Sequence, residues 1–203
     1  MNKQKLAITS IFAIVALSLG TVATLSVSED GYVYVQSDIT KANPNITIAP
    51  MEYTLATDEI SETKHTVVLT VSGTVLSVGD PIDWTDESDN PLGFVPVTIE
   101  IDKKFKDKTT NLKLKKGAQF TVYLGGVYES DKFYMHGKEP QFEIGEQVIL
   151  HVGQDKNGPL FEDEGIYFVE LGKYGKYKVV DDKAYNDKNK EGKSLDKAFN
   201  ETN

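Results

Sequence analysis

Apolar and polar residues alternate along residues 66–78, and the rest of the chain is interpreted around this segment. It is rich in Val, Leu and Thr, which fit the pleated, half-buried surface of a strand. Val67, Leu69 and Val71 share one face before Gly73. After it Val75 keeps that face, but Leu76 and Val78 take the opposite one. A glycine at such a change of phase is typical of a bulge or tight bend. We therefore predict one long strand, bent in the middle, whose inward residues before the glycine are Val67, Leu69 and Val71.

Further alternating segments occupy residues 94–101, 119–124, 147–152 and 166–171, and residues 177–180 pair back. Pro96 lacks an amide donor, so its strand should begin at a sheet edge or a bulge, and Gly125-Gly126 should end the third strand. The segment between the third and fourth strands is a poor helix. This order predicts an all-β, five- to six-stranded, OB-like partly open Greek-key barrel. A small antiparallel sandwich is the alternative.

The N-terminus has the pattern of an export signal. Lys3 and Lys5 precede an uncharged run, residues 6–28. Its first part, residues 6–19, has the length of a signal-peptide apolar core, with a small-residue cleavage site after Ala23. The whole run is also about the length of one bilayer crossing, roughly 20 residues. Residues 1–28 are thus predicted to be a signal peptide or a transmembrane anchor, and in both cases the rest of the protein lies outside the cytoplasm.

The remaining chain divides into three parts by composition. Residues 29–64 should form an extended stalk with one short helical turn, in which Leu55 and Ile60 face the body. Residues 65–186 form the β domain. Residues 187–203 are rich in Lys, Asp, Asn and Glu, and we predict a disordered tail. Asn45 and Asn200 begin triplets that accept N-linked sugars.

Composition narrows the classes of function. The chain has 203 residues, a net charge of −9 and no Cys, which excludes disulfides, thiol catalysis and Cys-ligated metals. Every basic residue is Lys, so the bidentate contacts of Arg with phosphate and guanine are absent. With the acidic balance, this argues against a nucleic-acid partner.

Three motifs carry a resemblance to a known family. They are residues 71–75 (Val-Ser-Gly-Thr-Val), residues 142–150 (Phe-x-x-Gly-Glu-x-Val-Ile-Leu) and residues 172–179, the last followed by Ala184-Tyr185-Asn186. With the segment Asp80-Pro81-Ile82-Asp83-Trp84-Thr85-Asp86, they resemble a loose family of largely uncharacterised exported small β-barrel, OB-like domains. These domains occur in archaea and some bacteria, and the all-Lys composition and the segment from Asp80 to Asp86 most resemble the versions from ammonia-oxidising archaea. The resemblance covers residues 67–186 and implies the fold and the compartment, but no reaction.

The acidic loop of residues 80–89 is one candidate site. Asp83, Asp86 and Asp89 supply the carboxylate oxygens that Ca²⁺ prefers. The spacing is not that of an EF-hand, and the alternative is a solvated turn that keeps the domain soluble. Apart from this candidate calcium ion, the sequence predicts no cofactor.

Aromatic residues give a second candidate site. In OB-like barrels the first and last inter-strand loops flank the usual binding face. Trp84 stands in the first of these loops, and Tyr123 is on the outward side of the third strand. With Tyr128 and Tyr134 they form our predicted ligand-binding set. Alternatively, Trp84 folds its loop onto the body and buries its own ring.

The histidines and lysines are weaker candidates. His65, His136 and His151 come from separate elements, and His151 is predicted to face outward. Met135-His136 has the ligand types that copper favours. Residues 103–116 are rich in lysine, which suits either anionic lipid headgroups and polyanionic cell surfaces or a solvated connection.

No catalytic motif is present: we found no G-x-S-x-G, H-E-x-x-H, P-loop or G-x-G-x-x-G. The sequence therefore predicts a secreted or outer-face-anchored, non-catalytic module that binds an unidentified protein or cell-surface ligand. An exported Ca- or Cu-binding protein and a cell-surface hydrolase are the alternatives.

Overall fold

The computed structural model describes residues 57–85, 91–109, 112, 114–129, 132–155 and 166–203, and three short strands at 25–27, 33–35 and 46–48. Most of the predicted signal or anchor segment, residues 1–28, lies outside the described residues. Within the described part, no helix has both the length and the apolar character needed to cross a membrane.

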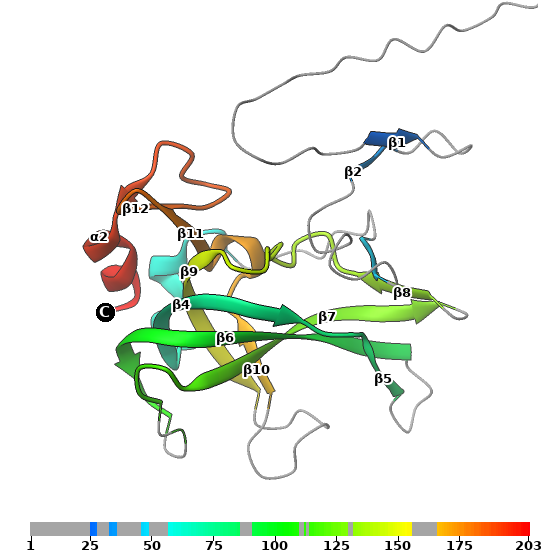
Figure 1. The fold of residues 1–203 in the computed structure, drawn as a ribbon, viewed down its shortest axis with the longest axis horizontal. Helices are drawn as coiled ribbons and strands as arrows, with labels where there is room; N and C mark the ends of the chain where they lie inside the picture. The colour runs from blue at the N-terminus through cyan, green and yellow to red at the C-terminus, as the bar shows by residue number, and fades with distance from the viewer. Residues whose placement is uncertain are drawn as a thin grey trace, which may run out of the picture.

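The body is one mixed but mostly antiparallel sheet (Figure 1). Its larger strands are β4 (Leu69–Val78), β6 (Pro91–Asp107), β7 (Gln119–Glu129) and β9 (Gln147–Asp155). Its shorter strands are β3 (Ile46–Ile48), β5 (Ile82–Thr85), β8 (Lys132–Met135), β10 (Ile166–Val169), β11 (Lys176–Val180), β12 (Lys183–Tyr185) and β13 (Lys193–Ser194).

The order across the sheet is β13-β12-β11-β9-β4-β6-β7-β8-β3, with β10 also paired to β9 and β5 also paired to β6. Only the β3–β8 pair is parallel among the described strands. A separate antiparallel pair joins β1 (Leu25–Val27) to β2 (Val33–Val35).

The bent strand is β4, which pairs with β6 on one side and with β9 on the other. Its register against β6 shifts at three places, one of them between Ser72 and Gly73. A methyl group at Gly73 would overlap the backbone carbonyl of Glu100, so only glycine fits this close approach. The predicted bulge is confirmed. A further shift lies between Val75 and Ser77, and the intervening Leu76 is exposed.

The sheet folds over so that its inner face encloses the main core. Strands β4, β6, β7, β8, β9 and β10 all contribute buried apolar residues to this core. Strand β10 packs across β7, where the ring of Tyr167 meets Phe120 edge-on at 5.2 Å. Val67, Leu69 and Val71 are fully buried, as predicted.

The prediction of an all-β fold is confirmed, but the sheet is open and not a closed barrel. The path of described strands ends at β13 and β3, and no hydrogen-bonded ladder joins these two ends. The core is covered by β10, which pairs with β9 and packs against β7, and not by a strand pair that closes the sheet into a barrel.

Strands β6 and β7 are longer than the sequence predicted, for two local reasons. Pro96 lies in the gap between the part of β6 that pairs with β5 and the part that pairs with β4, so its missing amide hydrogen leaves no ladder bond unmade. The expected end of β7 at Gly125-Gly126 is wrong. A side chain at Gly126 would overlap the ring of Phe133, so this glycine makes room for a core residue instead of ending the strand.

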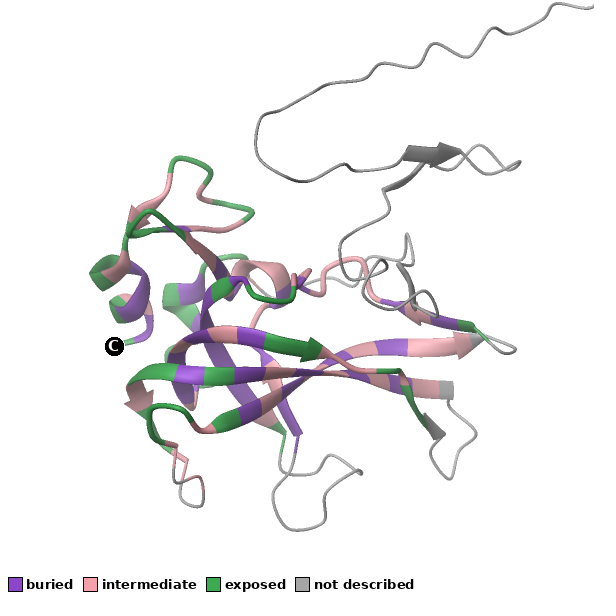
Figure 2. Ribbon diagram, viewed as in Figure 1, coloured by how far each residue is buried: buried purple, intermediate pink, exposed green. Residues whose placement is uncertain are grey.

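The C-terminal segment forms a second layer on the outer face of the sheet, and the predicted disordered tail is wrong (Figure 2). Helix α2 (Leu195–Phe199) begins at Ser194, whose side chain caps it, and the 3-10 turn η3 (Asn200–Thr202) follows. Two residues of the helix, Ala198 and Phe199, are buried. They pack with Ile149, Tyr177 and Ala184, which lie on β9, β11 and β12. The charged residues that suggested disorder lie mainly on the solvent side of this layer.

The predicted helical turn before the body is the 3-10 turn η1 (Ile60–Thr63), and Ile60 is buried as expected. Leu55 lies outside the described residues. A second 3-10 turn, η2 (Gly172–Tyr174), precedes β11.

Candidate ligand-binding cavity

The predicted aromatic binding set is not brought together on one face. Tyr123 lies opposite Pro96 and Tyr134 lies opposite Val127, so both belong to the outward face of β7 and β8. Tyr128 is on the inward face: its hydroxyl donates to the Pro81 carbonyl at 3.0 Å, and its ring meets Phe133 edge-on at 5.3 Å. Burial raises the pKa of Tyr123. Trp84 lies in β5 opposite Leu92.

The acidic loop is only partly described. Asp83 lies in β5 opposite Gly93, whereas Asp86 and Asp89 lie outside the described residues. No group of three or more His, Asp or Glu side chains within the described ranges is arranged to hold a metal ion.

Of the two candidate glycosylation sites, the structure describes only Asn200. Asn45 lies outside the described residues. Asn200 follows α2, and its side-chain amide donates to the Asp196 carbonyl at 2.8 Å.

His151 is the sharpest departure from the sequence prediction. It does lie on the outer face of β9, but the C-terminal layer covers it and leaves it 0% exposed. Its Nε2 is 3.0 Å from the carbonyl of Ala198, and its Nδ1 is 3.1 Å from the hydroxyl of Thr70. The carbonyl can only accept, so Nε2 carries the proton and Thr70 donates to Nδ1. Burial lowers the pKa of His151 to about 4, which keeps the ring neutral.

The other two histidines, His65 and His136, lie on other parts of the fold than His151. His65 is exposed, and His136 is partly buried beside Gly125, where burial lowers its pKa. The hydrolase alternative would need acidic residues and histidines to converge in one cleft. Asp83 lies on β5 and His136 follows β8, with strands β6 and β7 between them, so these two residues do not converge.

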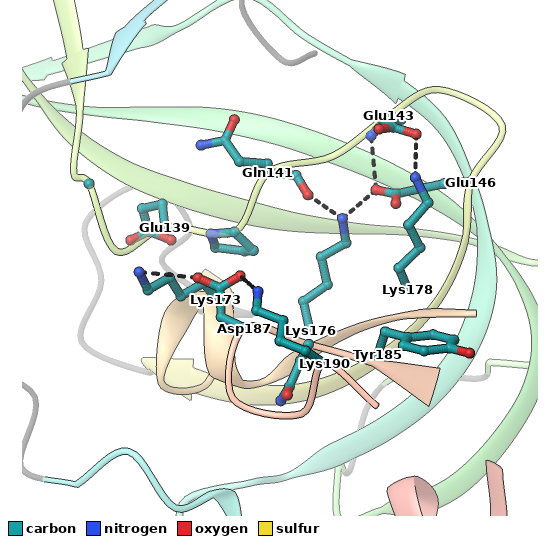
Figure 3. A pocket seen from close by; sticks show the side chains of 13 residues that line it. Glu139, Gln141, Glu143, Glu146, Lys173, Lys176, Lys178, Tyr185, Asp187 and Lys190 are labelled. Atoms are coloured by element: carbon teal, nitrogen blue, oxygen red, sulfur yellow. Dashed lines mark hydrogen bonds and ion pairs between the residues drawn. The ribbon is translucent and has the colours of Figure 1, made fainter. Parts of the chain in front are cut away.

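A cavity of about 420 Å³, lined mostly by charged and polar residues, lies between the loop that follows β8 and the turns around β11 and β12 (Figure 3). The backbone fixes its first wall. Gly145 adopts a positive φ of 86°, and its N–H donates to Val75 in β4 at 2.8 Å, while the Val75 N–H donates to the Glu146 carbonyl at 3.0 Å. The lining residues are Gly137, Glu139, Pro140, Gln141, Glu143, Glu146, Lys173, Lys176, Lys178, Tyr185, Asn186, Asp187 and Lys190.

A buried ion pair forms the floor of this cavity. The Lys176 ammonium donates to the Glu146 carboxylate and to the Gln141 carbonyl, and it lies 4.5 Å from the centre of the Phe142 ring. The side chains of Lys176 and Glu146 are only 11% and 3% exposed. Burial lowers the pKa of Lys176, and the adjacent carboxylate opposes that shift. Glu146 also accepts the Glu143 N–H at 2.8 Å, so this pair holds the loop in place.

The rim carries two further ionic groups. Lys178 pairs with Glu143 at 2.6 Å. Lys173 and Lys190 both pair with one carboxylate, Asp187, at 3.2 and 3.1 Å. Burial opposes the ionisation of Asp187, but hydrogen bonds from the two ammonium groups outweigh it and lower its pKa. Two cations on one anion leave this side of the cavity with a surplus positive charge.

Two other lining residues have unused hydrogen-bonding capacity. Burial raises the pKa of Glu139 to about 8, although a hydrogen bond with the Gly125 backbone favours its charged form. At neutral pH its carboxyl group is therefore mostly protonated and can donate a hydrogen bond. The side-chain oxygen of Gln141 is buried with no hydrogen-bond partner in the described part of the chain. A buried acceptor without a partner is costly to stability.

Sequence reasoning missed every residue of this cavity. The Phe-x-x-Gly-Glu turn and the lysine-rich 172–179 segment were recognised, but only as structural motifs. The lining contains no Ser, Thr, Cys or His, so it offers no hydroxyl or thiol nucleophile with an adjacent imidazole base.

Comparison with known proteins adds no assignment. No protein-family model matches the chain, and no curated protein matches it significantly.

Proposed function

We propose that this chain is an exported, secreted or membrane-anchored, non-catalytic module that binds a small hydroxylated carboxylate, such as a sugar acid, in the cavity beside β11. Its body is a variation on the OB-like partly open barrel. The export pattern of residues 1–28 supports the compartment. The observation that carries the proposal is the combination of surplus positive charge and a mostly neutral carboxyl group in the lining of one cavity.

The charge of the lining favours an anion. Four lysines face three carboxylates that each have a lysine partner, and Glu139 is mostly neutral at pH 7. The surplus is located at Asp187, where two ammonium groups share one carboxylate. A ligand carboxylate beside Lys173 and Lys190 would restore the balance with charge-assisted hydrogen bonds.

The hydrogen-bonding groups favour hydroxyls on the same ligand. The protonated carboxyl group of Glu139 can donate a hydrogen bond to a ligand hydroxyl. Tyr185 presents an aromatic ring at the rim, of the kind on which sugar rings stack (Figure 3). The volume of about 420 Å³ is in the range of small-molecule sites.

The test uses galacturonate and its neutral counterpart galactose, titrated into the full chain in mild detergent by isothermal calorimetry at pH 7. We expect galacturonate to bind and galactose to bind at least tenfold more weakly, because only the former carries the carboxylate. Lys190→Ala should weaken galacturonate binding roughly tenfold, the value of one charge-assisted hydrogen bond. The matched control is Lys183→Ala, which removes an exposed lysine of β12 outside the lining.

If galacturonate and galactose bind with equal affinity, the cavity does not recognise the ligand's carboxylate, and that part of the proposal is wrong. If neither binds, or if Lys183→Ala weakens binding as much as Lys190→Ala, the ligand class is wrong.

A further inference from the structure

The connection from β6 to β7 carries a concentrated positive charge on an acidic protein. Residues 102–116 contain seven lysines and two aspartates, a net charge of +5, whereas the whole chain carries −9. The lysines described as exposed in this segment are Lys103, Lys104, Lys108, Lys115 and Lys116. Apart from Lys104, which pairs with Asp107 at 2.7 Å, none of these five has an ion pair with a described residue.

The fold adds another lysine from far along the chain. Lys64, in the turn after η1, is exposed beside this segment. The ammonium groups of Lys106 and Lys108 both approach its backbone carbonyl, at 3.0 and 3.4 Å. Burial, and then repulsion by Lys108 and Lys64, lower the pKa of Lys106. Two ammonium groups thus approach one neutral acceptor, and the charge of Lys64 adds to their repulsion. An external anion would relieve this repulsion.

We propose that the lysine face, defined as Lys64, Lys103, Lys104, Lys108, Lys115 and Lys116, lies against an anionic lipid surface. Lysines near such a membrane contribute about 1 kcal/mol each through diffuse attraction. The ammonium group is a compact point charge, and the chain has no Arg for bidentate recognition of individual phosphates. The face therefore suits a sheet of headgroups better than a single, precisely oriented phosphate.

The distribution of charge along β6 would orient the body. This 17-residue strand begins beside the acidic 80–89 segment and ends in the lysine face. Figure 1 shows β5 at one end of β6 and the turn into β7 at the other. An anionic membrane attracts the lysine end and repels the acidic end, so the body would stand with β5 directed away from the lipid.

In one respect this inference rests on the proposed function: the N-terminal segment would bring the body to the membrane. The N-terminal segment would hold the body near the bilayer, and the lysine face would set which side of the body meets the headgroups. The experiment therefore tests membrane anchoring and the contact of the lysine face with lipid by separate measurements.

The full chain is placed in lipid nanodiscs of phosphatidylcholine, with or without about 30% phosphatidylglycerol, and the acetylation rate of each lysine is followed by mass spectrometry. We expect the lysine face to react at least about threefold more slowly on the anionic discs. Lys132 on β8 and Lys183 on β12 are exposed controls outside the face and should not change. Salt at about 0.5 M should abolish the protection because it shortens the screening length.

A charge-reversal variant supplies the matched perturbation. Replacing Lys103, Lys115 and Lys116 by Glu should abolish the protection of Lys64 and Lys108, whereas Lys132→Glu should leave it intact. These substitutions lie on exposed positions, and unchanged reactivity of Lys183 on neutral discs checks that the variant is folded.

Whether the chain stays in both kinds of disc tests whether the N-terminal segment is a membrane anchor. Retention with equal reactivity on the two discs overturns the lysine-face proposal and leaves the anchor standing. If the chain leaves the discs, the anchor is wrong, and the same footprint is measured with phosphatidylglycerol vesicles added to the released protein. Absence of protection there overturns the lysine face as well. Equal protection by dissolved polyphosphate at matched phosphate concentration would reassign the face to soluble polyanions and also overturn the proposal.

Discussion

Acidification should loosen the C-terminal layer through one buried side chain, His151. The ring is 0% exposed and lies between the Thr70 hydroxyl and the Ala198 carbonyl. Burial is the main reason that its pKa falls to about 4, and repulsion by Lys106 and Lys193 acts in the same direction. The hydrogen bond with the Ala198 carbonyl favours the charged ring and only partly compensates.

The sign and size of the effect follow from linkage. An unfolded histidine titrates near pH 6.5, so between pH 6.5 and about 4 the unfolded chain binds more protons at this residue than the folded chain. Stability from the neutral ring is fully present above pH 6.5 and is lost as the pH falls towards the folded pKa of about 4. A difference of roughly 2.5 units, at 1.36 kcal/mol per unit, corresponds to about 3 kcal/mol at pH 4.

The assay compares denaturant unfolding of the wild type and His151→Gln at pH 7, 6, 5 and 4. Many carboxylates also titrate in this range, so the informative quantity is the difference between the two proteins. We expect the destabilisation caused by His151→Gln to shrink by about 3 kcal/mol from pH 7 to pH 4. The control is His65→Gln, which removes an exposed histidine.

A direct titration of the His151 ring by NMR tests this prediction most sharply. If His151 titrates near pH 6.5 in the folded protein, or if the wild-type and His151→Gln curves run parallel, the ring is not held neutral by burial. The packing of the C-terminal layer would then be wrong.

Three further predictions concern stability and are measured by denaturant unfolding. The free energy of unfolding of Glu139→Gln should exceed that of the wild type by a margin that grows from near zero at pH 4.5 to roughly 4 kcal/mol at pH 8. The reason is that a carboxyl group with a raised folded-state pKa loses stabilisation as the pH rises through that range. A margin that does not change with pH would contradict the burial of this acid. Gly73→Ala should cost about 3 kcal/mol because its methyl group meets the backbone of β6, whereas Ser72→Ala should cost less than about 1 kcal/mol; equal costs would contradict the close approach. Lys176→Met should cost about 3 to 5 kcal/mol by leaving Glu146 unpaired, and adding Glu146→Leu should restore most of it; additive losses would show that the two charges are not coupled.

The bent strand could be predicted because its signal is local. A glycine at a change of phase is visible in a dozen residues, and the same residues set the burial of β4. The C-terminal layer was missed although a local signal exists. Ser194 is a capping residue, and Leu195, Ala198 and Phe199 have helical spacing. Five helical residues are too few to be stable alone, so their order depends on the sheet face they cover, which the sequence does not display.

The burial of His151 and the cavity were invisible for the same reason. His151 alternates with apolar residues, as an outward strand position does. It is buried by the C-terminal layer, which includes the distant Ala198. The cavity joins a loop after β8 to turns some 30 to 50 residues later. Glu139 and Gln141 gain their unusual properties from desolvation, which has no signature in residue type or spacing. Charged residues in polar loops resemble solvated surface until tertiary structure shows what surrounds them.

Strand β11 links the cavity to the C-terminal layer, because its side chains alternate between the two faces of the sheet. Lys176 and Lys178 lie opposite Leu150 and Val148 on the inner face, where they enter the cavity, whereas Tyr177 lies opposite Ile149 on the outer face. The Tyr177 hydroxyl donates to Glu201 in η3, so the C-terminal layer is bonded to the same strand that presents the cavity lysines. A change that releases this layer removes packing from one face of β11 while the ion pairs hold the other. The pH at which His151 becomes protonated should therefore also bound the range over which the cavity keeps its shape.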